Sequence, residues 1–292
     1  MTDQLKRLNK FISETGMCSR READRLIEQG LVKVNGEVAS MGLKVSEHDK
    51  VLVDGKPVAA KKPAVYLAYH KPVGITCTTE RDVKGNIIDA IGYKERIFPI
   101  GRLDKPSEGL IFLTNDGDIV NKILRAGNQH EKEYVVTVDK AITAEFIAAM
   151  ANGVPILGTV TKRCKVRQNS KFVFNIVLTQ GLNRQIRRMC EYLGYEVTKL
   201  KRVRIMNVSL QGLGVGKWRL LDEKQMAQIH QLTANSDKTQ DASAGFGAKT
   251  KGMKHKPHGQ STHLNRRSNS SSNKSSNKSS SKSTKKFHHK KT

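Results

Sequence analysis

The hydrophobic pattern at the start of the chain has helical spacing. It predicts an amphipathic helix over residues 4–15, ended by Gly16, with an apolar stripe made of Leu5, Leu8 and Ile12. Ser19 and Glu22 have the spacing of a capping box, in which each side chain accepts a hydrogen bond from a free backbone amide of the other residue. A second helix is therefore predicted to begin at Ser19 and to end at Gly30.

The pattern changes to strand spacing after this second helix. Val32 and Val34 alternate with polar residues and lead into Asn35-Gly36, the strongest short signal for a hairpin turn. A further strand is predicted over residues 51–53. Two short helices and a small sheet bury too little apolar surface for an independent enzyme, but they are sufficient for a binding module.

From about residue 64 the chain has longer strand-like runs that alternate with a few helices. The clearest runs are residues 66–69, 134–138 and 172–178, and the last of them alternates strictly at period 2. The helix that follows is predicted to be amphipathic. Its apolar face is formed by Ile186, Met189, Cys190 and Leu193, and its basic face by Arg184, Arg187 and Arg188. Asn183 is predicted to cap this helix and Gly194 to end it. Arginines near a helix N-terminus suit a phosphate or a carboxylate.

The composition adds a large excess of positive charge. The 292 residues include 52 Lys and Arg against 27 Asp and Glu, a formal net charge of +25 at pH 7, which favours a polyanionic partner. Residues 235–292 hold 14 Lys and Arg against 2 acids. Their serine- and lysine-rich runs lack the apolar residues that would offset the entropy of ordering, so this tail is predicted to be disordered. It either solubilises the protein or acts as a non-specific electrostatic arm for RNA.

Several other functions are disfavoured by the same composition. The longest apolar stretches are far shorter than the roughly 20 residues that cross a bilayer, and residues 1–10 are too polar for a secretory signal, so a cytoplasmic protein is expected. The four cysteines are irregularly spaced and no histidines have a metal-binding spacing. We expect neither a disulfide framework nor a metal site.

Asp104 is the carboxylate that the sequence indicates as a reactive group. Residues 98–105 lie between two apolar runs, which predicts a loop at strand ends. Arg102 and Lys105 flank Asp104, and nearby cations favour the ionised form that a nucleophile or a general base requires. By itself an aspartate beside an arginine is more often a structural ion pair or a turn residue. The assignment therefore depends on the other motifs of the chain.

The first fifty residues resemble the S4 RNA-binding domain. The resemblance rests, in order, on Arg7-Leu8-Asn9-Lys10, Gly16, Ser19-Arg20-Arg21-Glu22-Ala23, Ile27, Gly30 and Val32-Lys33-Val34-Asn35-Gly36. In that family, basic helix faces hold structured RNA by its backbone. The resemblance thus implies phosphate contacts for Arg7, Lys10, Arg20, Arg21 and Arg25. The alternative for each of these residues is a solvated helix flank.

The body of the chain resembles the RNA pseudouridine synthases, in the branch that carries an S4 domain. The motifs, in the order of that family, are Lys71-Pro72-Val73-Gly74, Gly101-Arg102-Leu103-Asp104, Gly109-Leu110 with Thr114-Asn115-Asp116-Gly117, Lys132-Glu133-Tyr134, and Gly181-Leu182-Asn183-Arg184-Gln185-Ile186-Arg187-Arg188-Met189. The likeness covers roughly residues 5–234. Ser107 and residues 131–166 are most similar to members that modify 23S ribosomal RNA. His70 departs from the family, where Asn is common before the Lys-Pro pair.

The resemblance assigns roles within the site. Asp104 is implied to be the catalytic aspartate, Tyr134 to pack against the target base, and Arg187 to pair with Asp104. Arg102 is implied to help hold the flipped-out nucleotide and its phosphate, and Arg184 to bind RNA. Moving a base from its N1 to its C5 glycosidic bond needs a carboxylate near the sugar and a base taken out of its stack, but no cofactor. By itself Tyr134 would more often be a core aromatic.

The fold class implied is α+β, in three parts. We expect an S4-like RNA-binding domain and linker over residues 5–63, a pseudouridine synthase domain with a mixed, mostly antiparallel sheet over residues 64–234, and the disordered basic tail over residues 235–292. The expected protein is a monomer whose partner is 23S ribosomal RNA or its precursor. A tRNA anticodon loop is a conceivable second substrate. Whether Asp104 attacks the sugar or assists through a glycal stays open, as does the group that removes the C5 proton.

Two other functions compete with this interpretation. A non-enzymatic RNA-binding or ribosome-assembly factor would use only the S4-like module and the tail, and it would have no role for Asp104. A different RNA-modifying enzyme is disfavoured because the zinc signature of deaminases and a GxGxxG loop are both absent from the sequence. The glycine-rich segment 212–217 fails both nucleotide-binding patterns, so it is interpreted as a turn that leads to Trp218.

Overall fold

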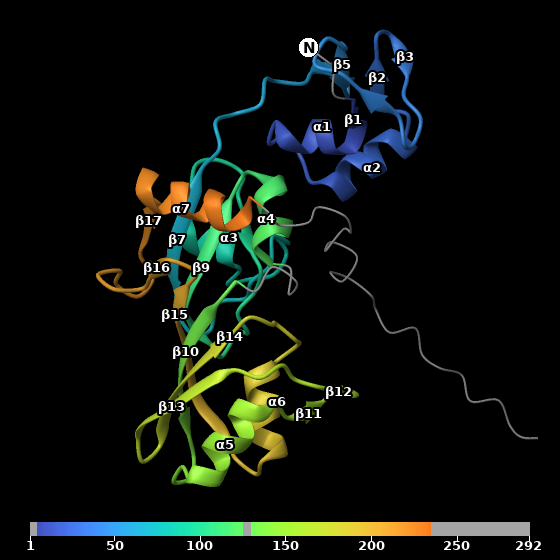
Figure 1. The fold of residues 1–292 in the computed structure, drawn as a ribbon. Coiled ribbons are helices and arrows are strands. Elements are labelled where there is room, and N and C mark those ends of the chain that lie inside the picture. The colour runs from blue at the N-terminus through green and yellow to red at the C-terminus, as the bar shows by residue number, and fades with distance from the viewer. Residues whose placement is uncertain (1–4, 125–129, 235–292) are drawn as a thin grey trace, which may run out of the picture. The chain divides into compact units, whose positions relative to one another are not determined.

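The computed structural model of the chain describes residues 5–124 and 130–234 (Figure 1). The tail predicted to be disordered, residues 235–292, lies outside them. The first part of the described chain is a small α+β module. Its elements are β1 (Lys6–Arg7), α1 (Leu8–Glu14), α2 (Arg20–Glu28), β2 (Val32–Val34), β3 (Glu37–Val38), β4 (Lys44–Val45), β5 (Val51–Val53) and β6 (Lys56–Pro57).

The first helix is shorter than its hydrophobic pattern predicts. Two residues of the predicted apolar stripe, Leu8 and Ile12, are buried in the core of the module, but Leu5 lies before the helix and is exposed. Lys6 and Arg7, however, form β1 and pair with β4, so α1 begins only at Leu8. The backbone of these residues is satisfied by a strand partner about forty positions away in the sequence. Helical spacing alone does not reveal such a partner.

The second helix and the hairpin agree with their predicted signals. The Ser19 hydroxyl accepts a hydrogen bond from the Glu22 amide at 3.0 Å, as an N-cap should. Only this half of the capping box forms, because the Glu22 carboxylate pairs with Arg25 instead. Asn35 and Gly36 have φ values of 53° and 95°, the left-handed pair that a two-residue hairpin between β2 and β3 requires.

The second part of the chain is organised on a nine-stranded sheet. Its order is β13-β14-β10-β15-β9-β7-β17, with β8 paired to β9 and β16 paired to β15. The strands are β7 (Tyr66–Lys71), β8 (Phe98–Ile100), β9 (Glu108–Thr114), β10 (Lys132–Val138), β13 (Lys165–Ser170), β14 (Val173–Leu178), β15 (Val197–Ile205), β16 (Val208–Ser209) and β17 (Trp218–Leu220). A separate hairpin consists of β11 (Pro155–Ile156) and β12 (Thr159–Val160). Among the pairings of this sheet in the described residues, only β15 with β9 is parallel. The predicted mixed, mostly antiparallel sheet is confirmed.

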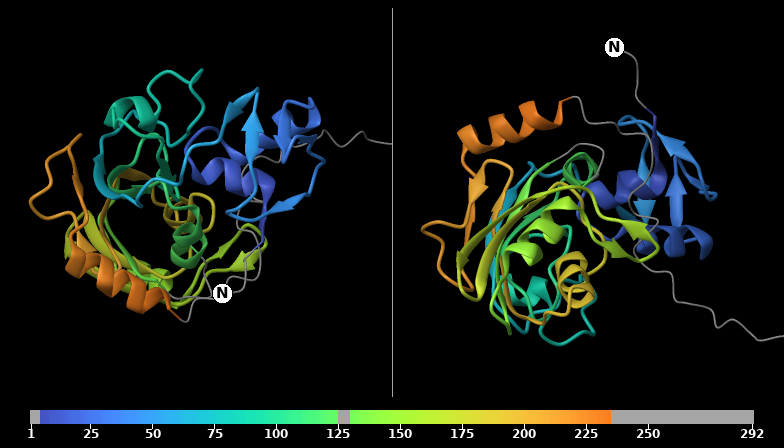
Figure 2. Two further views of the ribbon diagram at one scale, coloured as in Figure 1. Left: turned by 90° about the horizontal axis from the view of Figure 1, so that it is seen from above. Right: turned by 60° about the horizontal axis from the view of Figure 1, so that its bottom comes forward.

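Five helices cover the two faces of this sheet. They are α3 (Ile87–Ile91), α4 (Gly117–Leu124), α5 (Ala144–Asn152), α6 (Gln185–Tyr192) and α7 (Glu223–Thr233). Leu67 and Tyr69 of β7 pack with α3, whereas Ala68 between them packs with α4 and α7 on the opposite face. The helices α5 and α6 pack on β10 and β14, and Figure 2 shows the long strands curving around them. Among the described residues, no helix is long and apolar enough to cross a membrane.

Tyr134 lies where two hydrophobic clusters meet on one face of this sheet. Its ring packs against the cluster formed with α5 and α6 and also against the cluster formed with α3. Val136, two residues further along β10, belongs to the first cluster, so α3, α5 and α6 all cover the face that carries Tyr134. This junction is the place where side chains from distant segments converge.

Candidate active site

Asp104 lies in the connection between β8 and β9, as predicted, and this connection is held at several points. Ser107 donates its amide to the Asp104 carbonyl at 3.0 Å, and Gly74 donates its amide to the Lys105 carbonyl at 2.8 Å. Leu103 is buried, and its amide donates to the Cys77 sulfur at 3.4 Å. The backbone on both sides of Asp104 is therefore fixed, while its side chain keeps 33% of its surface exposed. A reactive carboxylate needs this combination of a fixed position and access.

The ion pair of Asp104 differs from the expectation. Arg184 Nη1 lies 3.6 Å from Asp104 Oδ2, whereas the resemblance implied a pair with Arg187. Arg184 is the N-cap residue of α6, with φ of 49° and no side-chain cap hydrogen bond, so it also takes the capping position predicted for Asn183. A non-glycine residue with positive φ is uncommon and is found most often where function requires it. In this protein the residue with the positive φ, Arg184, is the one that forms the ion pair with Asp104.

Arg187 instead holds the segment that follows Asp104. Its guanidinium donates to the carbonyl of Pro106 and to the hydroxyl of Ser107, both at 3.3 Å, and to the carbonyl of Val197 at 2.9 Å. Burial and the neighbouring Arg184 lower the pKa of Arg187, and Asp104 acts in the opposite direction. Arg187 is thus close enough to act electrostatically on Asp104, and its hydrogen bonds join α6 to the segment between β8 and β9.

A row of paired residues crosses the sheet beside Asp104. Lys71 on β7 pairs with Gly109 on β9, Gly109 pairs with Arg202 on β15, and Arg202 pairs with Tyr134 on β10. The Arg202 guanidinium carbon lies 6.0 Å from the centre of the Tyr134 ring, which is a cation–π geometry. The strand that follows Asp104 therefore brings Lys71 and Tyr134 to the same site.

Lys71, Lys132 and Arg202 were not among the predicted site residues, yet all three are buried in this region. Lys132 was visible in the sequence as the residue two positions before Tyr134, on the same face of a strand. Burial lowers the pKa of Lys71, and it lowers the pKa of Lys132 to about 8. The period-2 pattern of β10 could therefore have indicated Lys132 as a site residue. Arg202 is brought to the site by the pairing of β15 with β10, which the sequence pattern does not reveal.

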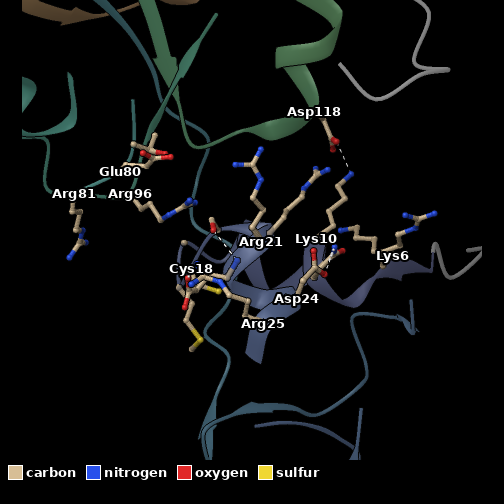
Figure 3. Close-up of a pocket in the computed structure, with 18 of the residues that line it drawn as sticks. Lys6, Lys10, Cys18, Arg21, Asp24, Arg25, Glu80, Arg81, Arg96 and Asp118 are labelled. Atoms are coloured by element: carbon tan, nitrogen blue, oxygen red, sulfur yellow. Dashed lines mark hydrogen bonds and ion pairs between the residues drawn. The ribbon is translucent and has the colours of Figure 1, made fainter. Parts of the chain in front are cut away.

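The remaining predicted residues are exposed, except for Lys10 and Arg20, which are half-buried. Arg102 is exposed in the same connection as Asp104. The residues implied to contact RNA in the S4-like module come from β1, α1 and α2 and line one pocket, part of which is shown in Figure 3: Arg7, Lys10, Arg20, Arg21 and Arg25. Within the module, Lys10 lies 3.4 Å from Glu14 and Arg25 pairs with Glu22. The predicted basic faces of the two helices thus share one concave surface.

Two further sequence features contribute to packing beside the site. His70, the departure from the family pattern, is 3% exposed, and its Nδ1 lies 2.7 Å from the carbonyl oxygen of Leu213. It therefore holds the glycine-rich segment that was interpreted as a turn. Trp218 follows that segment, donates its ring N–H to the carbonyl of Ile91 at 3.2 Å and packs edge-on against Tyr93.

Comparison with known families and proteins agrees with this geometry. The family model described as RNA pseudouridylate synthase matches residues 65–192, and the model described as S4 domain matches residues 6–51. A crystal structure titled as a pseudouridylate synthase has 29% sequence identity and a TM-score of 0.57, over 77% of this chain and 99% of its own.

Curated relatives extend the similarity over most of the chain. The dual-specificity RNA pseudouridine synthase RluF of Salmonella typhi is 58% identical over 256 residues, which cover 87% of this chain and 89% of the relative. RluF of Escherichia coli K12 is 57% identical over 87% of this chain and 88% of the relative. Ribosomal large subunit pseudouridine synthase B of Bacillus subtilis is 34% identical over 78% of this chain and 97% of the relative.

Proposed function

Because this chain belongs to the family of RNA pseudouridine synthases, isomerases that convert uridine in RNA to pseudouridine, we propose that Asp104 is its catalytic residue and 23S ribosomal RNA its substrate. One observation carries the catalytic assignment. Asp104 is a partly exposed carboxylate on a fixed turn, paired with Arg184 at 3.6 Å and next to the arginine that anchors the turn. Support for the substrate comes from the relatives, whose printed names include a large-subunit pseudouridine synthase.

The reaction needs little more than this site offers. The N1–C1′ bond of uridine breaks, the base turns, a C5–C1′ bond forms, and the C5 proton leaves while N1 gains a proton. Asp104 either attacks C1′ or removes a sugar proton to give a glycal. Each route requires a carboxylate beside the ribose, and Asp104 is the partly exposed carboxylate that Arg184 holds at 3.6 Å. No redox or group-transfer step occurs, so no cofactor is assigned.

The other predicted residues act on the RNA. Tyr134 packs against the extracted base, which costs a few kcal/mol to unstack and therefore needs a new apolar or aromatic neighbour. Arg102 and Arg184 hold the nucleotide and its phosphate, with Arg184 exchanging Asp104 for the incoming anion. The basic pocket of the S4-like module holds the RNA backbone away from the reacting uridine. We assign the enzyme as a monomer that acts in the cytoplasm.

A second RNA substrate is included in the proposal. The relatives named RluF carry the description dual-specificity, which favours two RNA classes over one. We propose a tRNA anticodon loop as the second, because unstacking is least costly where a base already lies in a single-stranded loop.

The decisive experiment measures tritium release from 5-tritiated uridine in 23S ribosomal RNA taken from cells that lack this protein. C5 loses its hydrogen only when the new glycosidic bond forms there. Asp104→Asn is expected to abolish release while it leaves RNA affinity nearly unchanged, and the exposed carboxylate of Glu191 on α6 provides the matched control Glu191→Gln, with wild-type release. Sequencing the product locates the uridine, and bulk tRNA tests the second substrate.

Each outcome decides one part of the proposal. Wild-type turnover by Asp104→Asn would remove this residue from catalysis. Release from tRNA alone would overturn ribosomal RNA as the substrate. Tight binding without release from either RNA would favour the ribosome-assembly factor, which has no use for Asp104.

A further inference from the structure

Three cationic side chains are buried together on the sheet face that carries Tyr134. They are Lys71, Lys132 and Arg202, with 0%, 9% and 4% of their surface exposed. Each comes from a different strand, β7, β10 and β15, and the strand order β10-β15-β9-β7 places Arg202 between the two lysines. We call these three residues the cation cluster.

The cation cluster is not neutralised by nearby acids. Within residues 5–124 and 130–234, none of its members forms an ion pair with a carboxylate. The two lysines donate only to backbone carbonyls: Lys71 to Pro72 and Ser107 at 2.8 and 2.7 Å, and Lys132 to His130 at 3.1 Å.

Arg202 is the member with the least complete set of partners. Its Nε donates to the carbonyl of Leu110 at 2.6 Å, but its Nη2 is buried without a hydrogen-bond partner in the part of the chain that the structure describes. The acids that act on Lys71 at longer range are Asp104 and Glu108, and Glu108 is itself held by Lys201 at 2.9 Å. Among the described residues, the positive charge of the cation cluster is therefore opposed only at longer range, without a carboxylate in an ion pair with any of its members.

Such a cluster is unfavourable for folding. A buried charge without a paired opposite charge destabilises the folded state, and replacing buried ions by apolar side chains of similar volume is often neutral or stabilising. Arrangements of this kind persist mainly where a functional site requires them. In this fold the site next to the cluster is the one that holds Asp104 and Tyr134.

We propose that the cation cluster stabilises the negative charge that develops on the uracil when its bond to the ribose breaks. This inference rests on the proposed function. When the N1–C1′ bond breaks, its electron pair stays with the base, which becomes an anion delocalised over the ring until it forms the C5–C1′ bond. Both routes open to Asp104 pass through this charge.

The cluster is placed to act through space on a base that packs against Tyr134. Arg202 lies 6.0 Å from the centre of that ring, and buried charges are poorly screened, so they act further than they would in water. Fixed charges that need no rearrangement during the reaction are the most effective form of transition-state stabilisation. The three residues are positioned for this role without contacting the substrate themselves.

Lys132 provides the cleanest test of the cation cluster. It has one hydrogen bond and a neutral side chain of similar length is available, so Lys132→Met removes the charge with little change in shape. Lys132→Arg keeps the charge, and Lys199→Met removes an exposed charge from β15 as the matched control. The measurements are the single-turnover rate on saturating 23S ribosomal RNA, the RNA dissociation constant and the melting temperature of the full chain.

The rate of Lys132→Met is expected to fall on the order of tenfold, with an unchanged RNA dissociation constant and an equal or higher melting temperature. Lys132→Arg is expected to recover most of the rate, and Lys199→Met to match the wild type. A structural role for Lys132 predicts the opposite pattern, in which rate and melting temperature fall together. That result, or a wild-type rate in Lys132→Met, would overturn the inference.

The pH dependence gives a readout that a structural role does not move. Lys132 has a pKa lowered to about 8 by burial and by Arg202, so it is charged below this pH and loses its charge above it. The groups that face it are Arg202 from β15 and His130 from its own chain segment, and its strand partners Leu178 and Ile205 are apolar.

The wild-type rate should therefore decline as the pH rises through about 8, and this decline should be absent in Lys132→Met. Titration of the uridine itself would appear in both proteins, so the comparison separates the two causes. An identical decline in both would overturn the role of Lys132. Absence of any tritium release by the wild type would instead refute the proposed function.

Discussion

Gly109 has no side chain at the point where β9 passes closest to β15. A Cβ atom at this position would lie 2.3 Å from the carbonyl oxygen and 2.5 Å from the amide nitrogen of Arg202, and φ at Gly109 is 119°. Backbone atoms of a paired strand cannot move aside as the end of a flexible side chain can. The close approach of β9 and β15 therefore explains why position 109 of the motif is a glycine.

Gly109→Ala is expected to lower the free energy of unfolding by about 2–4 kcal/mol, because the clash with Arg202 adds to the unfavourable positive φ. Chemical denaturation monitored by circular dichroism measures this change. The matched control is Gly212→Ala, where φ is 74° but nothing lies within 4 Å of the added Cβ. Its loss should be nearer 1 kcal/mol. Equal losses in the two variants would show that the approach of the strands is not restrictive.

The arrangement of the arginines at the start of α6 was predicted only in part from the sequence. The sequence placed Arg184, Arg187 and Arg188 on one exposed face, and two of them, Arg184 and Arg187, lie close enough to Asp104 to interact with it. The resemblance implied that Arg187 pairs with Asp104, whereas the structure pairs Asp104 with Arg184. Nη1 and Nη2 of Arg187 donate to Val197 and to the segment that follows Asp104, and its Nε is buried without a hydrogen-bond partner among the described residues.

At the scale of elements, two helices begin with different versions of the same cap. Ser19 at α2 accepts one hydrogen bond from the amide of Glu22, whereas at α7 Asp222 and Gln225 form a full reciprocal box. The hydrogen bond from Gln225 N to Asp222 Oδ1 is 2.7 Å long. The charged Asp222 also opposes the positive end of the helix dipole.

Removing these caps should therefore have unequal effects. Ser19→Ala is expected to weaken α2 by about 1 kcal/mol, and Asp222→Ala to weaken α7 by about 1–2 kcal/mol. Amide hydrogen exchange along each helix measures the local change. Ser13→Ala, which removes a side-chain bond within α1 rather than a cap, serves as the control with a smaller effect. A larger loss of helix stability in Ser19→Ala than in Asp222→Ala would contradict the greater stabilisation that we expect from the reciprocal capping box of α7.

At the scale of the whole molecule, the net charge of +25 determines how the protein meets RNA. Binding that releases counterions from phosphates weakens linearly in the logarithm of salt concentration, with a slope set by the number of contacts. The basic pocket of the S4-like module places Arg7 and Arg25 among those contacts. Both side chains are exposed and lie away from Asp104 in the sequence.

The double variant Arg7→Gln with Arg25→Gln is expected to reduce this slope by about 1.5 and to leave the rate on saturating RNA unchanged. Filter binding of 23S ribosomal RNA at several salt concentrations measures the slope. Lys50→Gln with Lys56→Gln removes the same number of exposed charges from the module outside the basic pocket and should change the slope less. Equal slopes in the two double variants would mean that the pocket is not the RNA-binding surface of the module.

The sequence by itself determined the structural features that depend on residues close to one another in the chain. The hairpin at Asn35-Gly36 and the cap at Ser19 are set by local backbone geometry, and the strand predicted over residues 172–178, observed as Val173–Leu178, by its own alternation. Motif order likewise identified the family and pointed to Asp104, since a motif is a property of the chain. These features require no knowledge of what packs against them.

The tertiary structure decided what depends on residues far apart in the chain. Strand pairing converted Lys6 and Arg7 from a predicted helix into β1, and it placed Lys71, Gly109, Arg202 and Tyr134 in one row. Hydrophobic patterns record that a residue is buried, but not which strand it will adjoin. A buried lysine or arginine therefore looks like an exception in the sequence, and only the assembled sheet shows that Lys71, Lys132 and Arg202 are buried on the face that carries Tyr134.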